Sequence, residues 1–307
     1  MTRAVVFAYH DVGCRCLGVL LDQGLEVPLV VTHSDDPKEN LWFGSVAALS
    51  RARGIETITP GDPNTAEFVA RVRGLKPDFL FSFYYRSMLG LALLAIPARG
   101  AYNMHGSLLP KYRGRAPVNW AVLHGETQTG ATLHEMVEKP DAGRIVDQEA
   151  VPILPDDLAV DVFGKVTGAA ERVLARSLPG LVYGSAVLRS QDLSKGSYFG
   201  GRRPEDGRID WSQSAKRIHD LVRAVAPPYP GAFTELEGKR LRVLRTRLLP
   251  RNDPVRPSAF LHAEAGRCLA ACADGGALEV RELELDCKAL SAQEFANRIG
   301  TRRIAML

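Results

Sequence analysis

The sequence lacks the glycine-rich signatures of nucleotide chemistry and any apolar run long enough to cross a membrane. The turn after the first predicted strand, Tyr9-His10-Asp11-Val12-Gly13, has no G-x-G-x-x-G pattern, which disfavours a dinucleotide cofactor. There is no Walker loop and no G-x-S-x-G elbow. The longest apolar run, Met88 to Ile96, falls well short of the ~20 residues that span a bilayer. We therefore expect no membrane insertion.

Secretory and zinc-binding patterns are also missing. Thr2-Arg3 leads directly into a strand-like apolar run rather than a leader, so we expect a cytoplasmic protein. The five cysteines are odd in number, and the spacings Cys14-x-Cys16 and Cys268-x-x-x-Cys272 do not match a zinc module. Reduced thiols and no metal are the expectation.

The charge balance is mildly basic. A formal net charge of +4 suits an anionic small molecule but is too diffuse to indicate nucleic acid. Five basic residues crowd the stretch 239–247. We interpret them as the solvated face of a strand pair, with a docking face for another subunit as the alternative.

The first part of the chain alternates apolar runs with helix-like patterns, which is the order of a βαβ series. It predicts an α/β fold with a Rossmann-like, doubly wound, mostly parallel sheet that binds ligands at the carboxyl ends of its strands. The expected strands are 5–9, 27–32, 56–59, 79–83, a strand ending at 105, 132–137 and 144–152, and the expected helices are 13–23, 43–53, 65–74, 89–94 and 160–183.

The pattern changes after residue 183. A polar, glycine-rich passage over 191–208 is typical of a linker or an active-site loop. We predict a catalytic domain over 1–200 and a second domain over 201–307, consisting of a helix and a small OB-like β-barrel. The predicted elements are a helix over 215–225, ended by a proline-rich turn, and strands over 232–236, 241–248, 260–263, 267–271 and 278–285.

Asn103 and His105 are the first catalytic candidates, because side chains at i and i+2 of a strand share a face. We expect both to point into a cleft at the carboxyl end of their strand, with Met104 turned into the core. An amide can hold a developing oxyanion, and an imidazole can move protons near neutral pH. The pair is the minimal equipment for acyl transfer.

Asp141 is the third candidate. It lies in the turn Pro140-Asp141-Ala142-Gly143 between two predicted strands. A carboxylate brought to the cleft by this turn would favour the charged form of the His105 ring. The alternative is that Asp141 only stabilises its own turn, a common role of Asp in such a context, and the pattern leaves both interpretations open.

Other polar residues carry weaker signals. Ser107 is a tempting nucleophile, but its neighbours form no elbow, and we interpret it as a cap of the following segment. The remaining histidines have no comparable partner pattern, so a surface or satisfied-core role is expected for His10, His33, His124, His134, His219 and His262.

The segment Asn103-x-His105-Gly106-Ser107-Leu108-Leu109-Pro110-Lys111-Tyr112-Arg113-Gly114, followed by Asp141-Ala142-Gly143, closely resembles the signature of the 10-formyltetrahydrofolate-dependent formyltransferases. The resemblance covers almost the whole chain and implies 10-formyltetrahydrofolate as co-substrate. It implies that His105 transfers protons, that Asn103 stabilises the transition state and that Asp141 raises the pKa of His105. The folate pocket that it implies is lined by Ser87, Met88, Leu89, Arg115, Val137, Glu138, Lys139, Pro140 and Asp141.

Within that superfamily the stretches 7–11, 81–86, 113–117 and 199–203 look most like the formyltransferase domain of bifunctional polymyxin-resistance proteins of the ArnA type. This branch implies formylation of the 4-amino group of UDP-4-amino-4-deoxy-L-arabinose, for lipid A modification and polymyxin resistance. It also implies association with a UDP-glucuronate decarboxylating dehydrogenase or an aminotransferase of the same pathway. The sequence departs from this branch in two ways. Those proteins carry a second, NAD-dependent domain, whereas this chain ends at Leu307, and Tyr229 stands where relatives usually carry Trp.

Four alternatives stay open. A methionyl-tRNA formyltransferase shares the catalytic motif, but its members resemble one another in a basic loop after the second strand, and the equivalent stretch here, 33–40, is short and net acidic. For a dTDP-4-amino-sugar N-formyltransferase, the nucleotide of the substrate differs from UDP only in the base and one sugar hydroxyl. A binding protein without turnover would not need a poised imidazole. A hydrolase that releases formate would use the same oxyanion machinery.

Overall fold

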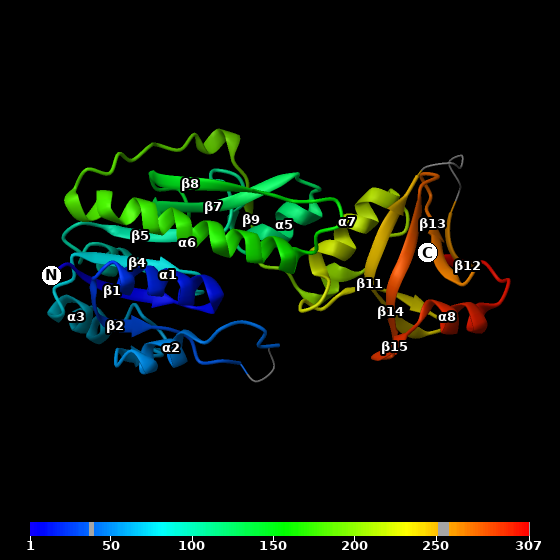
Figure 1. Ribbon diagram of the computed structural model, residues 1–307, viewed down its shortest axis with the longest axis horizontal. Helices are drawn as coiled ribbons and strands as arrows, with labels where there is room; N and C mark the ends of the chain where they lie inside the picture. Colours follow the sequence, from blue (N-terminus) through cyan, green and yellow to red (C-terminus); the bar gives the residue numbers. More distant parts are fainter. Residues whose placement is uncertain (37–39, 251–257, 307) are drawn as a thin grey trace. The chain divides into compact units, whose positions relative to one another are not determined.

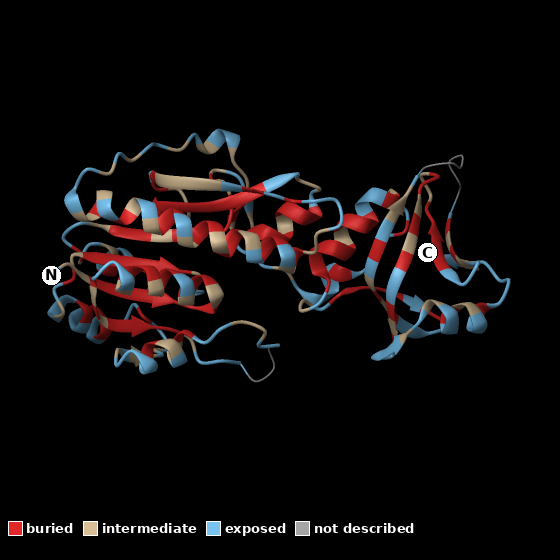
Figure 2. Cartoon of the chain, in the orientation of Figure 1, coloured by how far each residue is buried: buried red, intermediate tan, exposed pale blue. Residues whose placement is uncertain are grey.

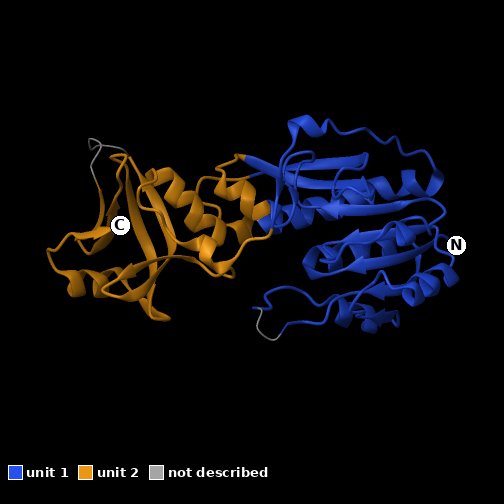
Figure 3. Ribbon diagram, turned by 180° about the vertical axis from the view of Figure 1, so that it is seen from behind, with its two compact units in different colours: residues 1–117, 128–152, 163–200 blue, residues 118–127, 153–162, 201–307 orange. Residues whose placement is uncertain are grey.

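The computed structural model describes residues 1–36, 40–250 and 258–306 (Figure 1). The chain forms two compact units, shown in Figure 3. Unit 1 comprises Met1–Pro117, Gln128–Pro152 and Phe163–Gly200, and unit 2 comprises Val118–Thr127, Ile153–Val162 and Gly201–Leu307. The last change of unit falls at residue 201, and two earlier segments also belong to unit 2.

Unit 1 is built on a seven-stranded sheet with the order β3-β2-β1-β4-β5-β7-β8. The first five strands of this order are parallel, whereas β7 runs antiparallel to both β5 and β8. The sheet is therefore mostly parallel, as the βαβ series predicts. Its strands are β1 (Arg3–Ala8), β2 (Glu26–Val31), β3 (Glu56–Ile58), β4 (Phe79–Phe83), β5 (Ala101–His105), β7 (Gln128–Glu135) and β8 (Ile145–Pro152).

Helices cover both faces of this sheet. On one face, α1 (His10–Asp22) lies beside α6 (Ala159–Tyr183), and Gln23 Nε2 donates to Ala175 O at 2.7 Å (Figure 1). On the other face, α3 (Ala66–Gly74) and α4 (Leu91–Leu94) pack on β1 and β2. Strands β1 and β4 are buried along almost their whole length (Figure 2), because both are apolar on two faces.

Local capping sets several helix ends. The helix expected over 43–53 is observed as α2 (Val46–Ala52), because the Ser45 side chain accepts a hydrogen bond from Ala48 N at 3.2 Å and caps the helix there. Helix α1 begins three residues before its expected start, at His10. A short α5 (Pro117–Leu123) and the strand pair β6 (Arg113–Gly114) and β9 (Tyr198–Phe199) were not predicted.

The sheet of unit 2 is antiparallel and curled, a half-barrel with the order β10-β11-β14-β13-β12-β16. Helix α7 (Ala215–Val225) has its expected bounds, whereas α8 (Ala292–Ile299), which starts with a capping box of Ser291 and Glu294, was missed. The strands are β10 (Ala232–Leu236), β11 (Lys239–Leu249), β12 (Ala259–Glu264), β13 (Arg267–Ala271), β14 (Ala277–Leu285), β15 (Lys288–Leu290) and β16 (Ile304–Met306).

Unit 2 contains two features noted in the sequence, the basic stretch 239–247 and Tyr229. The basic stretch on β11 faces acidic side chains, since Arg242 pairs with Glu284 at 2.9 Å and Lys239 with Asp286 at 3.1 Å. This pairing agrees with the interpretation as a solvated face. Tyr229 has its pKa raised to about 12 by burial, against the opposing effect of a hydrogen bond with Asn119.

Two further expectations concern the surface and the membrane. The short acidic stretch 33–40 is described only in part, because residues 37–39 lie outside the described residues. Within the described ranges, every helix is too short or too polar to cross a bilayer.

Candidate active site

Strand β5 places Asn103 and His105 on one face at its carboxyl end. Met104 points the other way and is 1 % exposed, as expected for a core side chain. Because β5 pairs with β4 on one side and with β7 on the other, Asn103 lies opposite Ser82 and His134, and His105 lies opposite Thr132. The two catalytic candidates therefore face residues of both neighbouring strands.

The Asp141 carboxylate meets His105 and two further groups. Its Oδ1 lies 3.5 Å from His105 Nδ1 and 3.5 Å from His134 Nε2, and its Oδ2 accepts from Gly114 N at 2.8 Å. All three contacts are with segments other than its own turn. The structure thus brings Asn103, His105 and Asp141 together, as the sequence predicts, and does not favour a role for Asp141 in its turn alone.

These contacts determine the charge of Asp141. Burial acts to raise its pKa, but three groups act in the opposite direction. They are the charged ring of His105, the ring of His134 when it is protonated, through a hydrogen bond and its charge, and the Gly114 N–H. Together they hold the pKa of Asp141 well below its usual range. The side chain is a carboxylate throughout the pH range in which the enzyme would work.

The His105 ring has an oxygen acceptor at each nitrogen. Nε2 lies 2.8 Å from Tyr112 O, and Nδ1 faces Asp141. Because a backbone carbonyl only accepts, Nε2 carries a hydrogen, and the carboxylate provides the partner for a second hydrogen on Nδ1. The site therefore accommodates the imidazolium form, which can give up a proton when a substrate replaces one of these acceptors.

His134 is a site residue that the sequence interpretation missed. It was assigned a surface or satisfied-core role, and it is indeed buried, but its Nε2 also lies 3.1 Å from Asn103 Nδ2. The signal that would have revealed it is the β5–β7 register, which pairs residues 31 positions apart. No local sequence pattern contains that register.

The loop that follows β5 is held from several sides. Ser107 donates to Lys111 O at 2.6 Å, so it stabilises the loop instead of acting as a nucleophile. Thr132 Oγ1 donates to Ser107 O at 2.6 Å and accepts from Gln148 Nε2 at 2.8 Å. Tyr112 has a left-handed φ of 58°. Such conformations persist only where the surrounding structure determines them, and they cluster at functional sites.

Some of the predicted folate residues lie in adjacent loops. Arg115 Nη2 is 3.5 Å from Arg86 O in the loop after β4, and Leu89 belongs to the same apolar cluster as Met136, the neighbour of Val137. Met88 and Val137 are large apolar side chains that are 59 % and 42 % exposed, which leaves them available to an aromatic ring. Ser87 and Pro140 are half-buried, and Glu138 and Lys139 are exposed.

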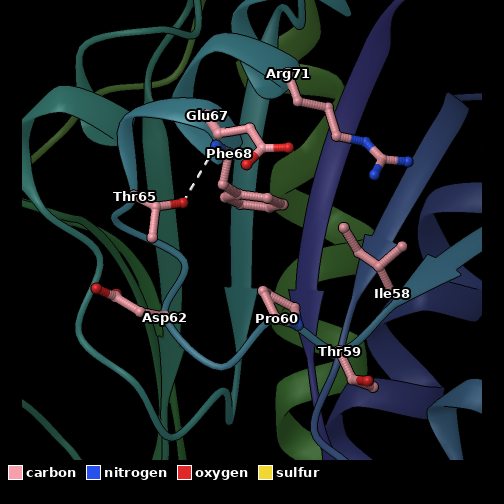
Figure 4. A pocket seen from close by; sticks show the side chains of 8 residues that line it. All are labelled: Ile58, Thr59, Pro60, Asp62, Thr65, Glu67, Phe68 and Arg71. Atoms are coloured by element: carbon pink, nitrogen blue, oxygen red, sulfur yellow. Dashed lines mark hydrogen bonds between the residues drawn. The ribbon is translucent and has the colours of Figure 1, made fainter.

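A cavity of about 340 Å³ lies elsewhere in unit 1, between the end of β3 and the start of α3 (Figure 4). Three of its polar side chains are engaged within the protein: Thr65 Oγ1 accepts from Phe68 N at 3.3 Å, Arg71 pairs with Glu56 at 2.5 Å, and Asp62 accepts from Asn64 N at 2.9 Å. Asn103, His105 and Asp141 do not line it, and its two carboxylates, Asp62 and Glu67, do not suit an anionic substrate.

Among residues 1–36, 40–250 and 258–306, no group of three or more His, Cys, Asp or Glu side chains is arranged to hold a metal ion.

Gly143 offers a test of how the Asp141 turn is built. A Cβ at this position would lie 2.1 Å from Glu135 O, a backbone atom of β7. We expect Gly143→Ala to lower the free energy of unfolding by about 1–3 kcal/mol through this steric clash. Urea denaturation measures the change. Gly164→Ala is the control, because nothing lies within 4 Å of a Cβ there in helix α6, and it should stabilise by about 0.5–1 kcal/mol. Equal stabilities of the two variants would contradict the close approach.

The pKa of Asp141 predicts a pH dependence of stability. The folded-state pKa lies below the usual value of 3.8, so the unfolded chain binds the proton more tightly. The stabilising contribution is complete above that usual value and is lost as the pH falls through the folded pKa. We expect denaturant midpoints of the wild type to decrease below about pH 4 more steeply than those of Asp141→Asn. Superimposable pH profiles of the two proteins would refute the low pKa.

Two protein-family models match this chain. The family model "Formyl transferase" matches residues 18–178, and the family model "Formyl transferase, C-terminal domain" matches residues 202–300.

Solved structures share the fold at low sequence identity. An N-formyltransferase from Helicobacter canadensis, in complex with folinic acid and dTDP-3-aminofucose, has a TM-score of 0.72 at 18 % identity and covers 91 % of this chain and 99 % of its own. WlaRD, a sugar 3N-formyl transferase solved with dTDP and 5-N-formyl-THF, has a TM-score of 0.72 at 17 % identity, covering 91 % and 97 %. A sugar N-formyltransferase from Shewanella sp FDAARGOS_354 has a TM-score of 0.64 at 19 % identity, covering 81 % and 99 %.

The first model alone spans more than half of the chain, and its range includes Asn103, His105 and Asp141. The two models follow the same order as the α/β sheet and the curled antiparallel sheet. This protein belongs to the formyl transferase family.

Proposed function

We propose that this protein transfers the formyl group of 10-formyltetrahydrofolate to the 4-amino group of UDP-4-amino-4-deoxy-L-arabinose. The observation that carries the proposal is the meeting of Asn103, His105 and Asp141 at the carboxyl end of β5. The reaction would take place in the cytoplasm and serve lipid A modification and polymyxin resistance. A decarboxylating dehydrogenase or an aminotransferase of the same pathway would be its partner.

The three side chains would divide the chemistry as follows. The uncharged 4-amino group attacks the formyl carbon, and the oxyanion that develops is stabilised by Asn103 Nδ2 and by the protonated ring of His105. The new carbon–nitrogen bond forms first and gives this tetrahedral oxyanion. Its collapse restores the carbonyl and breaks the bond to the folate nitrogen, and His105 helps to carry the proton from the amine to that nitrogen. Asp141 keeps the imidazolium oriented. No covalent enzyme intermediate is required.

Folate would bind between the loop after β4 and the turn between β7 and β8. Ser87, Met88, Leu89 and Arg115 would line one side, and Val137–Asp141 the other. The contact of Arg115 with Arg86 O and the shared cluster of Leu89 and Met136 support this arrangement. The described relatives with folinic acid and 5-N-formyl-THF support the choice of a formylated folate.

An anionic acceptor is supported by Arg113. Its side chain is buried, and its Nε and Nη1 have no hydrogen-bond partner among the described residues. A buried guanidinium without acceptors is costly, and a diphosphate would supply them. Gly114, the next residue, donates to Asp141, so this cation lies on the same short strand as a component of the proposed site.

A dTDP-linked amino sugar is the second candidate acceptor, because two of the similar structures contain dTDP or a dTDP-linked amino sugar. The two nucleotides differ by the methyl group of thymine and one sugar hydroxyl, so the two acceptors require nearly the same site.

Alanine variants test the catalytic assignment. We expect Asn103→Ala and His105→Ala each to lower kcat by about 10²–10³-fold, because each removes one stabiliser of the oxyanion, worth ~3 kcal/mol. Steady-state kinetics with UDP-4-amino-4-deoxy-L-arabinose and 10-formyltetrahydrofolate measure this. Near-wild-type turnover of either variant would refute its role. Formate release in the absence of amino sugar, at the rate of transfer, would identify a hydrolase instead.

A ligand panel tests the acceptor. UDP, dTDP and tRNA are each added with a folate analogue, and the thermal midpoint is compared with that of the folate complex alone. We expect UDP to raise the midpoint most, since at equal concentration a ligand that binds only the folded state stabilises it more the lower its Kd. Selective stabilisation by dTDP would support the second candidate. Selective stabilisation by tRNA would contradict both.

A further inference from the structure

His134 has a hydrogen-bonding pattern that defines its tautomer. Its ring is buried on β7, directly opposite Asn103 in the register. Nδ1 lies 2.7 Å from Glu135 O, and Nε2 lies 3.1 Å from Asn103 Nδ2. Because the carbonyl only accepts, the hydrogen of the neutral ring must be on Nδ1. Nε2 is then an acceptor, and an amide NH₂ is the partner that it requires.

Without such a partner, the orientation of the Asn103 amide group is ambiguous. Its oxygen and nitrogen are nearly the same size, so packing alone does not choose between the two orientations, and hydrogen bonds do. His134 Nε2 accepts from one of the two N–H groups of Asn103 Nδ2. The second N–H group of this amide is then left to donate elsewhere. Nε2 also lies 3.5 Å from Asp141 Oδ1, the same oxygen that lies 3.5 Å from His105 Nδ1. The nitrogen end of the amide therefore lies on the side of the His105–Asp141 pair.

We infer that His134 is a positioning residue for formyl transfer: its Nδ1-protonated tautomer fixes Asn103 with Nδ2 toward the reacting carbon. This inference rests on the proposed function, in which Asn103 donates to the oxyanion. His134 touches no substrate in this scheme. It acts through Asn103, and the charged groups that face it are Asp141 and, across that carboxylate, His105.

Replacing the ring tests the hydrogen bond. His134→Leu removes the acceptor at nearly constant volume, and we expect kcat to fall on the order of 10- to 100-fold with both KM values within about twofold, because misorientation of one catalytic group costs this much. His134→Gln places a carboxamide oxygen near the former Nε2 position, and we expect it to recover most of the loss. Equal activity of the two variants would overturn the proposal.

A double-mutant cycle separates this role from a general structural one. If His134 acts through Asn103, then His134→Leu has no further effect on kcat in the Asn103→Ala background. If it acts through Asp141 or through stability, the loss persists there, and the proposal fails. Wild-type activity of Asn103→Ala alone would refute the catalytic assignment itself, so failure of the inference and failure of the proposed function give different results.

Thr129→Val is the matched control. Thr129 is a buried residue of the same strand, and its hydroxyl has no hydrogen-bond partner in the part of the chain that the structure describes. The change is isosteric and lies at the opposite end of β7 from His134. We expect unchanged kcat, and a loss as large as that of His134→Leu would show that any buried change in β7 disturbs the site.

Discussion

The carboxylate of Asp141 is the interaction on which the site depends. It is mostly buried, yet it remains charged, because His105, His134 and the Gly114 N–H surround it. Each partner comes from a different strand: β5, β7 and β6. A buried charge needs such partners. The same contacts in turn fix the rings of His105 and His134 and the position of strand β6. The geometry of the catalytic cluster follows from keeping this one charge satisfied.

The register between β5 and β7 brings His134 into the cluster. The parallel strands present their carboxyl ends at one edge, where β4 and β5 end. Strand β7 runs antiparallel to β5 with His134 directly beside Asn103, and it ends at Glu135, opposite Tyr102 near the start of β5. The turn that follows β7 therefore folds back to bring Asp141 against His105 and His134. Gly143 allows this turn to approach Glu135 O closely.

The sequence predicted the parts of the fold that carry a local pattern. The bounds of β4 and α7 are as expected, and Asn103 and His105 share a face because side chains alternate along a strand. His134 was missed because its role depends on a register between distant residues. Strands β6 and β9 were missed because each has two residues, too few for a periodic pattern. The passage over 191–208, which contains β9, was therefore interpreted as a linker or an active-site loop. Helix α8 was overlooked although Ser291 and Glu294 form a capping box.

The most direct test is a crystal structure of the ternary complex with an unreactive 10-formyltetrahydrofolate analogue and the nucleotide-linked amino sugar. The account predicts the formyl oxygen at about 2.7–3.1 Å from Asn103 Nδ2, with His105 in hydrogen-bond reach of the reacting atoms and Asp141 still bound to the ring. A formyl group bound away from Asn103, or a His105 ring turned away from both Asp141 and the substrate, would contradict it.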